Sequence, residues 1–91
     1  MVYYFLGRYG EAIEAGDRAV ARNPGRTIQM MTHPVLAAAY AEMGRDQDAA
    51  GERASVTRLS PVFSVERFAA QFGTQETRDH MLDGLKKAGF R

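Results

Sequence analysis

The 91-residue chain contains no cysteine, no tryptophan and only three prolines. Without cysteine, disulfide frameworks and metal sites built on thiolates are excluded. No apolar run approaches the roughly 20 residues that a membrane-spanning helix needs. The opening segment also lacks the basic residues and the apolar length of a secretory signal. We therefore expect a cytoplasmic protein without a membrane partner.

An excess of charge of one sign is also missing. Twelve Lys and Arg are interspersed with eleven Asp and Glu, which gives a net charge of +1 and no basic block. Nucleic-acid binding usually shows itself as a clustered basic patch, so no nucleic-acid partner is expected. A small helix-turn-helix nucleic-acid-binding domain is the alternative function, and it would need a basic recognition helix.

No group of residues indicates catalysis. His33 and His80 lie far apart in the sequence and have neither cysteine nor a second histidine at metal-ligand spacing. The glycines around Arg8 lack the Gly-Lys-Ser/Thr of a phosphate-binding loop. We therefore expect a non-enzymatic chain that has no catalytic residues, no cofactor and no metal ion.

What the chain does contain is a repeat. A shift of 37 residues brings turn residues, small residues and one aromatic residue onto residues of the same type. The matched pairs are Tyr3 and Tyr40, Gly7 and Gly44, Arg8 and Arg45, Ala12 and Ala49, and Pro24 and Pro61. Positions of this kind are set by backbone and packing geometry, so the chain is expected to repeat one structural unit.

Each copy has the period of an amphipathic helix. After the first glycine, apolar and small residues recur three and four positions apart, as on one helix face. The predicted unit is helix, glycine turn, helix, proline, because glycine permits a tight turn and proline stops a helix. The segment from Pro24 to Pro34 is expected to begin as a loop and to enter the next helix near Thr32 or Pro34.

Two further helices are predicted after Pro61. Ser64 and Thr74 are placed to cap their N-termini, and Gly89 to end the last one. With the repeat, this makes six helices, of which the first is short.

The repeated residues resemble the tetratricopeptide repeat (TPR) family. The resemblance is carried by Leu6-Gly7-Arg8-Tyr9, Ala12, Ala19 and Pro24, and then by Leu36, Ala37, Tyr40, Gly44, Ala49 and Pro61. It implies an all-α fold of antiparallel helical hairpins in an α-α superhelix. Residues 1–61 would form a partial and one full repeat, and residues 62–91 two C-terminal capping helices, all in one domain. The short first helix resembles the cut end of a longer array.

The tail is similar to the ends of a narrower group of proteins. Ser60-Pro61-Val62-Phe63-Ser64 and Asp83-Gly84-Leu85-Lys86-Lys87 resemble the C-terminal endings of bacterial signalling proteins. In those proteins an adenylate or guanylate cyclase domain, or a transcriptional-regulator domain, precedes the TPRs. The resemblance implies a C-terminal fragment of such a protein, without the cyclase chemistry.

The expected function is non-catalytic protein–protein interaction or self-association. By the resemblance, first helices line the inner face, where a protein or peptide partner would bind. The candidate partner-binding residues are Tyr4, Phe5, Met31, Ala38, Ala41 and Glu42. Tyr3 is expected to pack inside, like Tyr40. Tyr4 and Phe5 would then form an exposed apolar N-terminal edge through which a homodimer could form.

Overall fold

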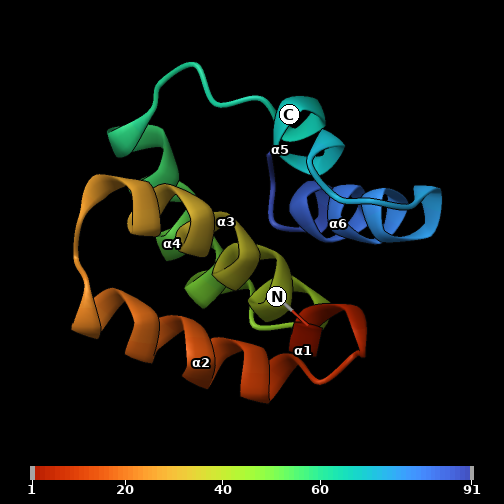
Figure 1. Ribbon diagram of the computed structural model, residues 1–91, viewed down its shortest axis with the longest axis horizontal. Coiled ribbons are helices and arrows are strands. Elements are labelled where there is room, and N and C mark those ends of the chain that lie inside the picture. Colours follow the sequence, from red (N-terminus) through yellow and green to blue (C-terminus); the bar gives the residue numbers. More distant parts are fainter. Residues whose placement is uncertain (1, 91) are drawn as a thin grey trace.

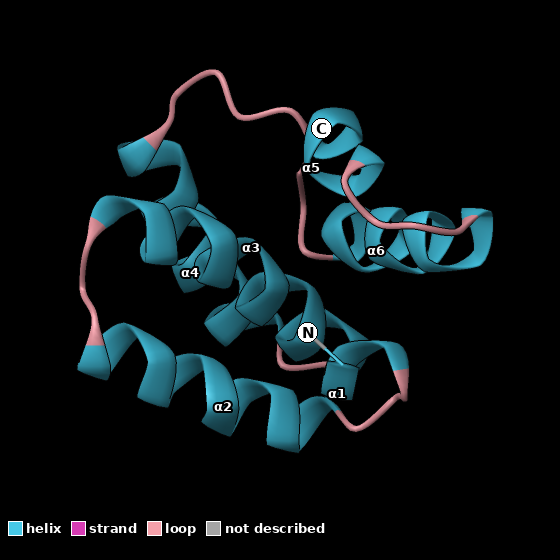
Figure 2. Ribbon diagram, viewed as in Figure 1, coloured by secondary structure: helices cyan, strands magenta, loops and turns pink. Residues whose placement is uncertain are grey.

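The computed structural model describes residues 2–90, and in that range it is helical throughout, with turns and loops but no strand (Figure 2). Six helices follow one another: α1 (Val2–Phe5), α2 (Tyr9–Arg22), α3 (Arg26–Glu42), α4 (Asp46–Leu59), α5 (Val65–Ala70) and α6 (Gln75–Lys87). The all-α class and the six helices with a short first one are confirmed for these residues.

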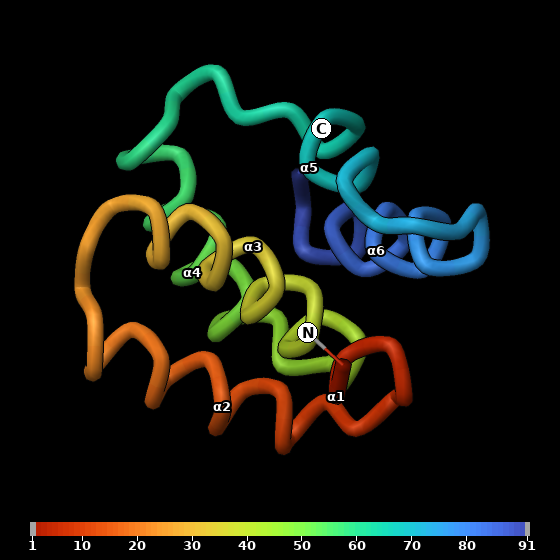
Figure 3. The backbone as a smooth tube through the Cα atoms, viewed as in Figure 1, coloured from red at the N-terminus to blue at the C-terminus, as the bar shows by residue number. Residues whose placement is uncertain are grey.

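Helix α3 lies at the centre of the molecule. It packs against α2, α4 and α6, as the ribbon and the trace both show (Figure 1 and Figure 3). Its middle is buried without interruption from Pro34 to Ala39, because neighbouring helices cover it on several sides. Three of these residues are alanines, whose small side chains let the neighbouring helices approach closely.

The two predicted glycine turns have the same backbone geometry. Gly7 and Gly44 both have φ +77°, in the left-handed region that favours glycine. The backbone N–H of Arg8 donates to the carbonyl of Tyr3 over 2.9 Å. The N–H of Arg45 donates to the carbonyl of Tyr40 over the same distance. The shift of 37 residues in the sequence therefore corresponds to a repeated turn in space.

The caps predicted for the C-terminal helices are also confirmed. The Ser64 hydroxyl accepts from the backbone N–H of Arg67 over 3.2 Å at the start of α5. Thr74 and Thr77 form a reciprocal capping box at the start of α6. Gly89, with φ +96°, follows the end of α6. These residues fix where α5 and α6 begin and end.

The predicted loop between Pro24 and Pro34 is wrong. Helix α3 begins at Arg26, so most of this segment is helical and Pro34 lies in the helix interior. A proline there removes one backbone donor, but its ring is buried in the core. The remainder of the segment is rich in residues that tolerate helix, which outweighs the missing hydrogen bond.

Candidate functional site

The predicted inner face is covered by the chain's own last helix. Tyr4 and Ala38 are both 0 % exposed, and Ala41 is also buried. Helix α6 packs along α3 and touches α1, and its buried residues Met81 and Leu85 join the same apolar core. The two helices of the inner face thus already hold an amphipathic helix.

Helix α6 crosses the inner face at a glycine. A β-carbon added to Gly84 would overlap the hydroxyl of Tyr4 and would lie 2.8 Å from Cβ of Ala38. Real β-carbons do not approach other atoms so closely. Only glycine therefore lets the backbone of α6 come this near to α1 and α3. Further along α6, Ala88 packs in a second buried cluster with Ala41.

A polar cluster closes one end of this crossing. The Glu42 side chain is 7 % exposed, and its Oε1 accepts from Nζ of Lys87 over 2.8 Å. Lys87 also lies 3.2 Å from the Asp83 carboxylate, one turn earlier on α6. A nearly buried carboxylate needs such a partner, because burying an unpaired charge is costly. The ion pair between Glu42 and Lys87 therefore links α3 to the end of α6.

Two tyrosines and a histidine extend the cluster. The Tyr4 hydroxyl donates to the backbone carbonyl of His80 over 2.9 Å and lies 3.4 Å from Oε2 of Glu42. The Tyr9 hydroxyl lies 2.9 Å from Nε2 of His80, so α2 is tied to α6 as well. Nε2 of His80 is in turn 3.6 Å from Glu42.

The ionisation of these groups is shifted by their surroundings. Burial, and then the charge of Glu42, raise the pKa of Tyr4. The same two causes raise the pKa of Tyr9, against a smaller opposing effect of Lys87. Hydrogen bonds to Glu42 and Asp83 raise the pKa of Lys87. The tyrosines thus stay protonated and Lys87 stays charged near neutral pH, the states in which they hold α6 in place.

Phe5 is half-buried against Phe72, which follows α5, and against His80 of α6. Its ring lies 5.1 Å from that of Phe72, at an edge-to-face angle of 71°. The row continues from Phe72 to Phe68 over 5.7 Å, and from Phe68 to Phe63 over 5.7 Å. Phe63 lies 5.2 Å from Phe90. The C-terminal helices therefore reach α1 through a continuous aromatic row.

The predicted N-terminal apolar edge is consequently wrong. Tyr4 is fully buried and Phe5 half-buried, because α6 packs on α1 and α3 and the ring of Phe72 lies against Phe5. The exposed apolar side chains of α1 and its turn are instead those of Val2, Tyr3 and Leu6.

The expected interior placement of Tyr3 is also wrong. Its side chain is 37 % exposed and lies under the guanidinium of Arg8, 5.3 Å from ring centre to Cζ. Its counterpart Tyr40 is half-buried under Arg45 at 4.7 Å. Consecutive helix residues point in different directions, and the buried direction in α1 belongs to Tyr4.

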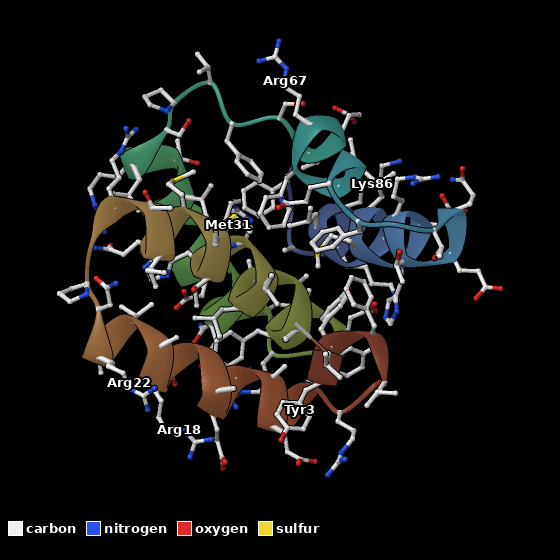
Figure 4. All side chains as sticks on the ribbon, in the orientation of Figure 1. Tyr3, Arg18, Arg22, Met31, Arg67 and Lys86 are labelled. Carbon is white, nitrogen blue, oxygen red and sulfur yellow. The ribbon has the colours of Figure 1, made fainter. Side chains whose placement is uncertain are left out.

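Met31, which is labelled in Figure 4, lies on α3 and packs against the main apolar core. It lines an open groove of about 350 Å³ between α3, the segment after α4, and α5. Met30, Phe63 and Phe68 line the same groove, and Val62 at its lip is 86 % exposed. Met31 also lines a smaller cavity of about 140 Å³ between α2 and α3. The structure thus groups Tyr4, Ala38, Ala41 and Glu42 beneath α6, with Phe5 beside them, whereas Met31 packs on the same core and lines the open groove.

The sequence reasoning missed the residues of the covering helix. His80 and Lys87 were not among the predicted site residues. The helical spacing of Met81, Leu85 and Ala88 nevertheless predicts an amphipathic helix, whose apolar face must pack on another part of the protein. The guanidinium of Arg53, in α4, donates to the carbonyl of Ala88 over 2.6 Å, so it caps the end of α6.

Comparison of the chain with protein-family models, curated proteins and solved structures finds no match. Within residues 2–90, no helix has the length and apolar character to cross a bilayer. In the same range, His, Asp and Glu side chains do not gather in a group of three or more that could hold a metal ion.

Proposed function

We propose that the chain is a non-catalytic protein–protein interaction and self-association module whose inner face binds an amphipathic helix. One observation carries the proposal: α1 and α3 together already hold such a helix, α6. The resemblance of the repeated residues to TPRs supports the same reading. So does the resemblance of the tail to the ends of bacterial cyclase-type signalling proteins, of which this chain would be a C-terminal part.

Recognition would rest on shape and one buried acid. Ala38 and Tyr4 leave room only for a small residue at the crossing point, where Gly84 lies. Glu42 demands a cation about one turn further on, where Lys87 lies. A suitable helix therefore carries a glycine, a lysine or arginine three residues later, and apolar residues on the same face.

The test uses a labelled peptide of residues 74–90 as the probe. Full-length chain carrying Gly84→Ala, whose own α6 is held less tightly, should bind this peptide more strongly than the unmodified chain does. Fluorescence anisotropy measures both affinities. A control peptide with Lys87→Glu should bind at least tenfold more weakly, because it brings a like charge to Glu42.

Absence of binding to either chain at high micromolar peptide would contradict the proposal. Binding of duplex DNA that weakens steeply with salt would instead favour the helix-turn-helix alternative.

A further inference from the structure

The C-terminal helices and the residue before them form one unit. Phe63 packs on Phe68 of α5 and on Phe90 after α6, and α5 packs on α6. The aromatic contacts of Phe63 therefore lie with residues 63–90, and it also lines the groove beside Met30 and Met31 of α3. This stretch, residues 63–90, is named the C-terminal unit below.

The link between α4 and the C-terminal unit is short and lightly held. It consists of Ser60, Pro61 and Val62, and Val62 is 86 % exposed. Its backbone hydrogen bonds are those of Ser60 to the end of α4 and of Phe63 to the carbonyl of Ser60. In Figure 1 the chain arcs here from α4 across to α5. A change of direction at this link would leave the core contacts on both sides intact.

The inner face has no free surface in a single copy, because α6 fills it. Exposing it without replacement would uncover Tyr4, Ala38 and Leu85, which are all buried. It would also leave the nearly buried carboxylate of Glu42 without Lys87. Any association through this face must therefore supply another helix with the features of α6, and a second copy of the chain carries one.

We propose that two copies exchange their C-terminal units, so that α6 of each lies on α1 and α3 of the other. The inference rests on the proposed function, since it names the partner of the same face. An exchanged dimer keeps every contact described beneath α6 and changes only the path of Ser60–Val62. The closed single copy is favoured at low concentration, because a short link gives an effective concentration on the order of millimolar.

A charge-reversal pair tests the exchange directly. One chain carries Glu42→Lys and the other Lys87→Glu, so each chain alone has like charges at positions 42 and 87. In an exchanged pair, the mixture restores opposite charges at both sites: Lys at 42 meets Glu at 87, and Glu42 meets Lys87. Mixing the two chains should give one-to-one dimers of twice the single-chain mass in light scattering and native mass spectrometry.

The matched control places both changes in one chain. Glu42→Lys with Lys87→Glu should fold with unchanged helical circular dichroism and stay a single copy at micromolar concentration. If this control folds and the mixture nevertheless contains only single chains, the exchange is wrong. If the control itself does not fold, the length of the link decides the matter.

Deleting Pro61 and Val62 should prevent the chain from turning back on itself and give dimers at micromolar concentration. Inserting Gly-Ser-Gly after Val62 should give single copies. Single copies from both link variants overturn the exchange. The peptide experiment separates the two failures: binding of residues 74–90 without exchange leaves the proposed function standing, whereas failure of both removes it.

Discussion

The hairpins α1–α2 and α3–α4 share their turns but differ in what their faces contact. Shifted by 37 residues, Tyr4 corresponds to Ala41, and both lie buried beneath the C-terminal part of the chain. The tyrosine reaches α6 with a ring and a hydroxyl, whereas the alanine lets Ala88 approach directly. The two hairpins therefore share the backbone geometry of their turns. The size of the side chain at the position of Tyr4 and Ala41 depends instead on how closely the C-terminal part of the chain approaches that position.

The second helices of the hairpins show the same contrast. Gly16 in α2 faces α3, and a β-carbon there would lie 2.7 Å from Cδ2 of Leu36. Its counterpart in α4 is Arg53, which reaches the end of α6. The first hairpin is followed by another hairpin and needs a small residue at that contact. After the second hairpin no third hairpin follows within residues 2–90, and the long side chain of Arg53 reaches the carbonyl of Ala88 at the end of α6.

The largest effect on stability is expected when Tyr4 of the first hairpin is replaced by alanine, the residue at the matching position 41 of the second hairpin. Tyr4→Ala should lower the free energy of unfolding by about 3–5 kcal/mol, because a fully buried aromatic side chain is lost and a cavity remains. Urea denaturation followed by circular dichroism measures this. The neighbouring Tyr3→Ala is the control and should cost about 1 kcal/mol or less, since Tyr3 is partly exposed. Equal costs would mean that α6 does not rest on Tyr4.

The crossing of α6 gives the next effect. Gly84→Ala should lower the free energy of unfolding by about 1–3 kcal/mol, because the added methyl group overpacks against Tyr4 and Ala38. Gly51→Ala is the matched control: Gly51 lies in α4 with open space around it, so alanine should stabilise by about 0.5–1 kcal/mol. Thermal and urea unfolding of both variants check the sign. Stabilisation by both substitutions would contradict the close approach of α6.

Turn and cap positions were predictable from the sequence because they depend on local chemistry. Gly7, Gly44, Ser64 and Thr74 act through their own backbone or through residues three positions away. The placement of α6 was not predictable, since it depends on how segments distant in sequence pack. For this reason the sequence did not predict that Tyr4 and Ala38 are both buried against Gly84 of α6.

The tyrosines of the two hairpins should make the stability of the chain depend on pH in the alkaline range. Burial raises the pKa of Tyr4 and Tyr9 in the first hairpin and of Tyr40 in the second. The unfolded chain, with tyrosine pKa values near 10, then loses these protons first. The contribution of these tyrosines to the free energy of unfolding should therefore be fully present below about pH 10. Above that pH the free energy of unfolding should decline, by up to about 1.4 kcal/mol per pH unit for each tyrosine.

The variant Tyr4→Phe isolates one of these hydroxyls. Its free energy of unfolding should decline less steeply between pH 10 and 11 than that of the unmodified chain, by about 1 kcal/mol per pH unit. Urea denaturation at several pH values gives the slopes, and absorbance at the tyrosinate band follows ionisation. Identical slopes for the two chains would mean that Tyr4 ionises as freely in the folded chain as in the unfolded one.

The smallest effects are expected at the turns, where the two hairpins are most alike. Arg8 lies over Tyr3 and pairs with Glu11, and Arg45 lies over Tyr40 and pairs with Asp48 at 2.8 Å. Arg8→Ala and Arg45→Ala should each cost about 0.5–1 kcal/mol, because both contacts are exposed to water.

Urea denaturation at low and high salt checks both turn variants, and added salt should reduce the two costs together, since exposed ion pairs are screened. The shorter distance of Arg45 to its ring makes its cost the larger of the two. A difference much above about 1 kcal/mol would show that the two turns, although alike in backbone geometry, do not stabilise their hairpins equally. In that case the two hairpins would share the backbone geometry of their turns but not the free energy that the turns contribute.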